Sequence, residues 1–371
     1  MDKRKKLIIA AAVAGIILYL CVSFYIKSTR NVIEKIVDNK DLINILITGR
    51  NVYKENTFNF YALVSINPAN NNIGITFIPP DYRIMMNDSG SDSIKISEVD
   101  FYYFDRIRYS LQKDLQLNVP FYVKIYASDV IRTIDLLDGV NLFSLDQAEC
   151  ITKGKTGLNY LDGHKALDYI NCANMNSIYI KYDRILDVLL TLYYEREKRL
   201  AQLNEDYITE IIKNIRTNLL PQEIFSVIKL ISGKGNVMST LLPGGTSAGF
   251  YLVDEINFKT YQQDFLGPLV AEGGAEPSVK IKILNGTSVQ GLARKLRNDL
   301  IRDGLTVTEF GTSNNGNFEH SVIICRQCDI FTANRTAEIA GIDRIYFITD
   351  TSQLTNVLII IGEDMVSEKQ K

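Results

Sequence analysis

The chain has 371 residues, of which 46% are hydrophobic and 23% charged, with a formal net charge of −2. This length allows two domains with a core each, and the near-neutral charge argues against a nucleic-acid-binding protein. Two histidines supply few ligands for a zinc or histidine-based site, and five cysteines do not form an even disulfide framework.

The N-terminus carries the pattern of a membrane anchor. A basic cluster at 3–6 precedes an uncharged, mostly apolar run at 7–26. A helix of about twenty residues spans about 30 Å, which is the thickness of a bilayer core. No small-residue cleavage site follows, so the run favours an uncleaved anchor over a signal peptide. The sequence therefore predicts a single-pass cell-membrane protein with a cytoplasmic N-terminus and extracytoplasmic main domains.

Composition shifts divide the remainder of the chain. Gly267, Pro268, Gly273, Gly274 and Pro277 indicate a linker between two globular regions. The predicted segments are a cytoplasmic tail at 1–6, a transmembrane anchor at 7–26, a stalk at 27–40, an α/β domain at 41–263, a linker at 264–278, a second α/β domain at 279–365 and a tail at 366–371.

The first domain alternates strand and helix patterns. Short apolar runs at 43–47, 61–66, 74–78 and 119–125 predict strands, the second and third of them a hairpin with an Asn-rich turn. Ser128 is a candidate N-cap for a helix beginning at Asp129, and 138–142 returns as a strand. Strands mixed with crossover helices predict an α/β sandwich with a central mixed sheet.

The second domain is a smaller α/β unit. Residues 279–283 alternate with period two, an Asn285-Gly286-Thr287 turn follows, and Gly304 ends a helix over 289–303. The remaining predicted elements are strands at 306–310, 322–325 and 357–361 and a helix at 331–340.

One block, from Gly157 to Leu192, organises the first domain. It contains Leu161-Asp162-Gly163, then Ala166-Leu167-Asp168-Tyr169, then a polar loop before a long amphipathic helix. Lys181 and Arg184 are three residues apart and project from the same side of that helix.

This block resembles the "L-[ND]-G-x-x-A-L-x-Y-x-R-x-R" and "R-x-x-R-Q" motifs of the LytR-CpsA-Psr family. Five further blocks precede it in the order that the family has, at 43–49, 61–68, 77–81, 94–96 and 138–140. The run "V-K-I-K-I-L-N-G-T-S-V-Q-G-L-A" from Val279 is similar to the LytR C-terminal domain. The resemblance implies a transferase that moves a phosphate-linked glycopolymer from a polyprenyl pyrophosphate carrier to peptidoglycan, assisted by a divalent metal such as Mg²⁺.

Several charged positions of the family's motifs are replaced. Asn51 stands for the Asp of "G-x-D-x-R", and Pro79-Pro80-Asp81 keeps the Asp of "P-R-D" but loses its Arg. The paired arginines after "A-L-x-Y-x" are Asn171 and Ala173, and Lys181 replaces the first Arg of "R-x-x-R-Q". Arg-to-Lys loses the bidentate fork that holds a pyrophosphate, and Asp-to-Asn removes the charge a metal needs.

The candidate site residues follow from this resemblance. Asp81 and Arg184 are the catalytic candidates, with Asp81 also the metal ligand, and the pyrophosphate-binding candidates are Lys95, Lys181, Arg184 and Arg83. Arg50 is a further cation that an altered site could use. Each also has a structural interpretation: Asp81 as a turn residue, Arg184 as a solvated or paired helix residue, and Lys95 as a solvent-facing strand residue.

Three hypotheses remain open, and with them whether the chain is an enzyme. The first is a family member with a degenerate site that binds a lipid-linked glycan with weak or no catalysis. The second is a working transferase with an altered site. The third is an envelope scaffold that acts through the C-terminal domain. A transferase would gather Asp81, Lys95, Lys181 and Arg184 at an apolar cavity, whereas in a scaffold aromatic residues such as Phe58, Phe60 and Tyr82 would fill it.

The other candidates carry less information. Cys325 and Cys328 form a CxxC with no second pair, which is compatible with zinc, a redox role or two ordinary thiols. His164 fits no nucleophile arrangement and begins a helix.

Overall fold

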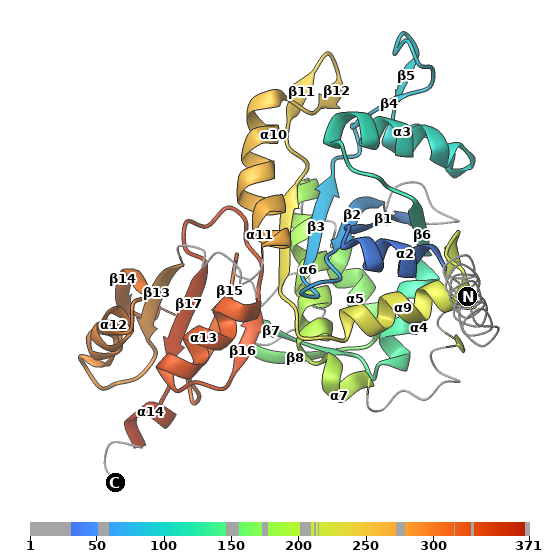
Figure 1. Cartoon of the computed structure of the whole chain (residues 1–371). Coiled ribbons are helices and arrows are strands. Elements are labelled where there is room, and N and C mark those ends of the chain that lie inside the picture. The colour runs from blue at the N-terminus through green and yellow to red at the C-terminus, as the bar shows by residue number, and fades with distance from the viewer. Residues whose placement is uncertain are drawn as a thin grey trace, which may run out of the picture.

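The computed structural model describes residues 31–50, 59–145, 156–172, 177–200, 209–210, 213, 215–271, 279–314, 316–327 and 330–367. A six-stranded sheet and a five-stranded sheet, each with its own helices, dominate this part of the chain, and Figure 1 shows them side by side. Three two-stranded sheets, β4-β5, β7-β8 and β11-β12, complete it.

The first sheet is mixed, as predicted, with the strand order β10-β3-β2-β1-β6-β9. β1 pairs antiparallel with β2 and parallel with β6, and β2–β3 is the predicted hairpin. The strands of this domain are β1 (Ile43–Arg50), β2 (Phe60–Ile66), β3 (Ile73–Ile78), β4 (Arg83–Met85), β5 (Ser93–Lys95), β6 (Phe121–Tyr126), β7 (Val140–Ser144), β8 (Gly157–Leu161), β9 (Arg216–Thr217), β10 (Val237–Leu241), β11 (Gly245–Ser247) and β12 (Phe250–Leu252).

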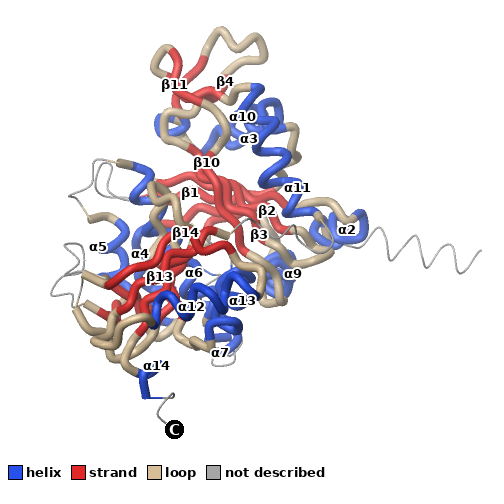
Figure 2. The backbone as a smooth tube through the Cα atoms, turned by 90° about the vertical axis from the view of Figure 1, so that its left-hand side faces the viewer, coloured by secondary structure: helices blue, strands red, loops and turns tan. Residues whose placement is uncertain are grey.

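Helices cover both faces of this sheet, as Figure 2 shows. One face packs against α4, α5 and α6, and the other packs against α3 and α10. Because both faces are covered, β2 and β3 are almost continuously buried. The helices of this domain are α2 (Val32–Asn39), α3 (Phe104–Leu115), α4 (Ala127–Leu136), α5 (Gly163–Ile170), α6 (Ile178–Tyr194), α7 (Arg196–Leu200), α9 (Pro221–Ile231), α10 (Glu255–Tyr261) and α11 (Gly267–Val270), with shorter turns η1 (Ile96–Glu98), η2 (Phe101–Tyr103) and η3 (Gln262–Leu266).

The start of α4 differs from the prediction. The helix begins at Ala127 after Tyr126, and the Tyr126 N–H donates to the Asp129 carboxylate at 2.8 Å. Ser128 therefore lies inside the first turn and is not the N-cap, and the carboxylate of Asp129, three residues after Tyr126, satisfies the N–H at the helix start.

Part of the predicted linker is helical. Residues 264–270 lie within η3 and α11, and Phe265 and Leu269 are buried. Both side chains pack over Gly74, where a Cβ atom would lie 2.9 Å from the Phe265 ring and 3.0 Å from Leu269. Gly267 and Pro268 suit this segment because proline is tolerated in the first turn of a helix. Residues 272–278 lie outside the described part of the chain.

The second sheet has the order β14-β13-β17-β15-β16. Its predicted strands and helices are present, and the structure adds the short strand β16 and the short helix α14, whose three and four residues are too few for a sequence pattern. The elements are β13 (Lys280–Asn285), α12 (Leu292–Arg302), β14 (Thr306–Thr312), β15 (Val322–Cys325), α13 (Ile330–Ala340), β16 (Ile345–Phe347), β17 (Val357–Ile361) and α14 (Asp364–Ser367).

The prediction of a membrane anchor has to be corrected. Throughout the described ranges, no helix has both the length and the apolar character needed to cross a bilayer. The longest, α6, has 17 residues and carries Lys181, Asp183, Arg184 and Asp187, so it serves as a core helix. Residues 7–26 lie outside the described part of the chain. The transmembrane helix in the predicted fold class and the single-pass membrane localisation are accordingly not supported.

Close packing of α4 on α5 gives a stability prediction. A Cβ atom on Gly163 would lie 2.1 Å from the backbone oxygen of Ile131, which cannot move without shifting α4. We expect Gly163→Ala to lower the free energy of unfolding by about 1–3 kcal/mol, measured by denaturant titration. Gly245→Ala is the control because a Cβ atom there meets no atom within 4 Å; equal effects of the two substitutions would contradict the prediction.

Candidate functional site

Asp81 and Lys95 form an ion pair at the base of the β4–β5 hairpin. The Lys95 ammonium lies 2.8 Å from the Asp81 carboxylate, and the two side chains are 34% and 50% exposed. The hydrogen bond and the charge of Asp81 raise the pKa of Lys95. Arg83 is directly opposite Lys95 in the hairpin register. Three of the predicted site residues therefore lie together on one short hairpin.

Tyr82 fixes this hairpin to the core. Its side chain is 0% exposed, and its hydroxyl donates to the Asp114 carboxylate of α3 at 2.9 Å. Burial raises the pKa of Asp114, and the Tyr82 hydrogen bond and the nearby Arg83 charge oppose that shift. The Arg83 Nε is buried without a hydrogen-bond partner among the described residues. Arg83 thus lies against the domain core, where its charge faces Asp114.

Lys181 and Arg184 form a second group, on the first turns of α6. The side chain of Arg184 is 6% exposed, and its Nη1 donates to the carbonyls of Tyr169 and Cys172 at 3.2 and 3.3 Å. Its guanidinium carbon lies 5.6 Å from the centre of the Tyr169 ring. Burial lowers the pKa of Arg184, and burial together with the charge of Arg184 lowers the pKa of Lys181. The two cations therefore repel one another in a partly desolvated place.

A neighbouring tyrosine joins this turn of α6 to the sheet. The hydroxyl of Tyr182 donates to the Ile78 carbonyl at 2.7 Å, and its ring stacks on Phe77 at 4.5 Å. Asp81 follows Ile78 by three residues, so the start of α6 contacts the end of β3 that leads to the hairpin group. The charged groups of Asp81 and Lys95 pair with each other, whereas the guanidinium of Arg184 donates to the carbonyls of Tyr169 in α5 and of Cys172 just after it.

Two buried acids on α6 were missed from the sequence. Asp183 and Asp187 are 7% and 2% exposed, and Asp187 accepts a 2.6 Å hydrogen bond from the Tyr169 hydroxyl. Burial raises the pKa of Asp183 and raises that of Asp187 to about 7. The sequence did contain a signal for them. Asp183 is three residues before Leu186 and Asp187 is three residues before Leu190, so both acids lie on the apolar side of an amphipathic helix, where an unpaired carboxylate is costly.

The described residues do not fit the Mg²⁺ that the family resemblance implies. No group of three or more His, Cys, Asp or Glu side chains in this part of the chain could hold a metal ion. The single candidate ligand, Asp81, is bonded to an ammonium group, which already balances its charge. Asn51, Phe58 and Ala173 lie outside the described residues.

Two of the described cysteines are oxidised, which differs from the interpretation of Cys325 as an ordinary thiol. Cys172 and Cys325 each take part in a disulfide bond, so Cys325 is neither an ordinary thiol nor a thiolate ligand for zinc. Cys328, the other half of the CxxC, lies outside the described residues.

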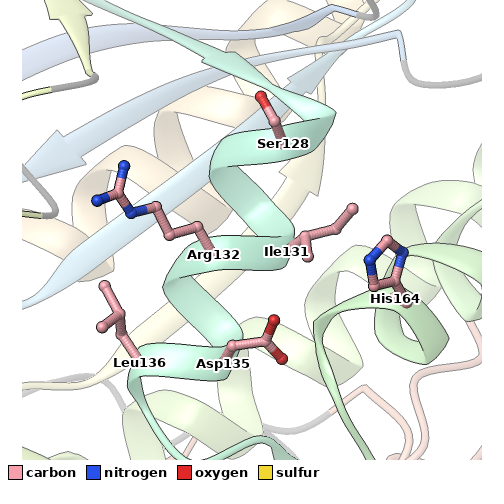
Figure 3. A pocket seen from close by; sticks show the side chains of 6 residues that line it. All are labelled: Ser128, Ile131, Arg132, Asp135, Leu136 and His164. Atoms are coloured by element: carbon pink, nitrogen blue, oxygen red, sulfur yellow. The ribbon is translucent and has the colours of Figure 1, made fainter.

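A hollow of about 540 Å³ lies elsewhere, between α4 and the start of α5 (Figure 3). Its lining includes Ser128, Asp135 and His164, three residue types found in hydrolase triads. Ser128 and Asp135 are seven residues apart on one helix, about 10 Å along its axis, so no single histidine could bridge them as a triad requires. Asp135 instead accepts the Gly163 N–H at 2.7 Å. His164 therefore stays without a catalytic arrangement, and none of the predicted site residues line this hollow.

Comparisons with known proteins agree with this architecture. Residues 278–364 match the family model described as LytR cell envelope-related transcriptional attenuator, which confirms the predicted C-terminal module. A Streptococcus agalactiae protein of known structure is 16% identical, with a TM-score of 0.50 over 65% of this chain and 92% of its own.

Bacillus subtilis TagT is 17% identical, with a TM-score of 0.48 over 62% of this chain and 91% of its own. Bacillus subtilis TagV is 18% identical, with a TM-score of 0.47 over 62% and 98%. One structure shows TagT bound to a ligand named LI-WTA. No curated protein sequence matches the chain.

Proposed function

Because residues 278–364 form a LytR C-terminal domain and the structural neighbours of the chain are LytR-CpsA-Psr proteins, we propose that the protein binds a phosphate-linked glycopolymer carrier in cell-envelope biogenesis. The ligand is a polyprenyl pyrophosphate or its glycan-bearing form, and peptidoglycan is the acceptor that the resemblance implies. Transfer is weak or absent in this proposal, and no metal-assisted step is part of it.

The observation that carries the proposal is the cation pair on α6. Lys181 and Arg184 are three residues apart on α6, and burial together with the charge of Arg184 lowers the pKa of Lys181, so two positive charges lie close together in a partly desolvated place. A pyrophosphate placed beside them would relieve that repulsion and form charge-assisted hydrogen bonds. Arg184 is oriented through Nη1 by two carbonyls, so it needs little reordering to bind.

Weak or absent transfer is supported by the hairpin group. Asp81 forms an ion pair with Lys95, which leaves its carboxylate poorly placed to act as a metal ligand or a general base. Phe60 and Tyr82, two of the aromatic residues expected to fill the cavity of a non-catalytic protein, are buried in the core. The alternative of an envelope scaffold acting through the C-terminal domain remains, and it predicts no carrier binding.

A binding measurement tests the proposal. We expect the purified full-length chain to bind a short-chain polyprenyl pyrophosphate, and Arg184→Ala to weaken this binding about tenfold or more because charge-assisted hydrogen bonds are lost. Arg184→Lys restores the charge without the fork and should recover part of the affinity. Arg302→Ala, which removes an exposed cation of the second domain, is the matched control and should leave binding unchanged.

A transfer assay on the same preparations separates the hypotheses. Turnover that disappears in Asp81→Asn would contradict the weak-transfer proposal and establish a working transferase. Absence of carrier binding by the wild-type chain would contradict the proposal as a whole and favour the scaffold.

A further inference from the structure

The second domain contacts the helix that carries the proposed site. The Thr349 N–H donates to Asp187 at 2.5 Å, and both the N–H and the hydroxyl of Thr351 donate to Asp183 at 3.3 Å. These donors belong to the segment 348–352, which directly follows β16. The two buried acids of α6 are therefore satisfied partly by a domain more than 150 residues further along the chain.

Aromatic packing holds this segment in place. Tyr346 stacks on Phe143 of β7 with ring centres 4.6 Å apart, and Phe347 meets the edge of Tyr194 of α6 at 5.6 Å. Figure 1 shows β16 beside β7. The aromatic contacts and the hydrogen bonds to Asp183 and Asp187 together give the docked domain one defined position. A shifted position would leave a buried acid without its hydrogen-bond donors.

Asp187 also links this contact to Arg184. One carboxylate oxygen accepts the Thr349 N–H, and the other accepts the Tyr169 hydroxyl at 2.6 Å. The Tyr169 carbonyl in turn accepts from Arg184 Nη1, and its ring lies against the guanidinium. A continuous series of contacts thus runs from the second domain through Asp187 and Tyr169 to the arginine.

We propose that the LytR C-terminal domain holds Arg184 in its anion-binding position, with Asp187 and Tyr169 as positioning residues, so that undocking of the domain weakens binding of a pyrophosphate. This inference rests on the proposed function, because Lys181 and Arg184 are the groups that bind the carrier there. It adds a regulatory role for the second domain, since any event that releases segment 348–352 acts on the site.

The titration of Asp187 gives the contact a pH dependence. Asp187 is faced by Tyr169 from α5, by Asp183 and Arg184 from its own helix, and by the Thr349 N–H from the second domain. Asp350, which is paired with Arg326 at 3.2 Å, acts on Asp183 from the same segment. Burial raises the pKa of Asp187 to about 7, whereas undocking would return it toward the ordinary value near 4. Because protonation removes the cost of the buried charge at Asp187, docking is strongest at low pH and weakens as the pH rises from about 4 to 7.

The experiment measures docking and binding separately on the full-length chain. Hydrogen exchange of the Thr349 and Thr351 amides, corrected for the intrinsic rate, reports docking between pH 5.5 and 8.5. Titration with a short-chain polyprenyl pyrophosphate at the same pH values reports binding. The variants are Tyr169→Phe, which keeps the ring and the carbonyl, and Asp187→Asn, which keeps the shape and removes the charge. Tyr102→Phe, at a tyrosine 89% exposed on the other side of the sheet, is the matched control.

We expect the wild-type chain to lose amide protection and carrier affinity together as the pH rises from 5.5 to 7, with little further change up to pH 8.5. Asp187→Asn should make both nearly independent of pH, and Tyr169→Phe should weaken binding on the order of fivefold while the amides stay protected. Carrier binding that is equal in the wild type, Tyr169→Phe and Asp187→Asn at every pH would overturn this inference and leave the proposed function intact. No binding by the wild type would overturn both, and the exchange data would then show whether the domains still dock.

Discussion

Replacing Asp187 with asparagine should make the stability of the protein less dependent on pH between pH 4 and 7. Burial raises the pKa of Asp187 to about 7, and an aspartate in the unfolded chain has a pKa near 4. Between these values the folded state keeps a proton that the unfolded state has released. Asp187 therefore adds stability at low pH, and this contribution falls by about 1.4 kcal/mol per pH unit as the pH rises from about 4 to 7.

Denaturant titrations at pH 5, 6, 7 and 8 measure this effect as the difference in slope between the wild type and Asp187→Asn. Asp105→Asn is the control because the side chain of Asp105 is exposed on α3. Identical slopes for the wild type and Asp187→Asn would mean that Asp187 titrates like an exposed carboxylate, and that Thr349 and Tyr169 stabilise its charged form far more than burial penalises it.

Tyr82→Ala should cause the largest loss of stability among single changes near the predicted site, about 3–5 kcal/mol. Tyr82 is 0% exposed, its hydroxyl donates to Asp114, and its carbonyl accepts the Ile96 N–H at 2.8 Å. Truncation opens a cavity beneath the hairpin that carries Asp81 and Lys95, and it leaves the Asp114 carboxyl without its donor.

Tyr82→Phe separates these two contributions. It keeps the ring and removes the hydroxyl, so its cost should be about 1–3 kcal/mol, the penalty for an unsatisfied buried partner. Urea titrations of both variants measure the difference. Equal destabilisation by the two substitutions would show that the hydrogen bond to Asp114, and not the packing of the ring, fixes the hairpin.

The position of the second domain explains why α6 can bury two acids, because that domain supplies hydrogen-bond donors to both of them. Buried carboxylates on a core helix are costly when isolated. Here, Asp183 and Asp187 receive backbone N–H groups from segment 348–352, so the cost is offset only while the domains are docked. The same two turns of α6 carry Lys181 and Arg184, which explains why docking and anion binding are expected to influence each other.

Local patterns in the sequence determined much of the fold. The β2–β3 hairpin, the strands at 322–325 and 357–361 and the helix at 330–340 follow from apolar periodicity and turn residues, which depend on neighbours in the chain. The strand, Asn-Gly-Thr turn and helix that begin the second domain identified its family, and the Asn285 side chain indeed accepts from Thr287 in that turn.

Only the tertiary structure decided how the charged residues are used. The sequence presents Asp81, Lys95, Lys181 and Arg184 as one set, but the fold pairs the first two at a hairpin and turns Arg184 toward carbonyls at the C-terminal end of α5. Asp187 accepts a hydrogen bond from Thr349, which is 162 residues further along the chain. Thr349 follows the three-residue strand β16, which is too short for periodicity to indicate. Periodicity records which face of an element is buried, whereas the partner of a buried charge depends on which distant element covers that face, and that is fixed only when the domains pack.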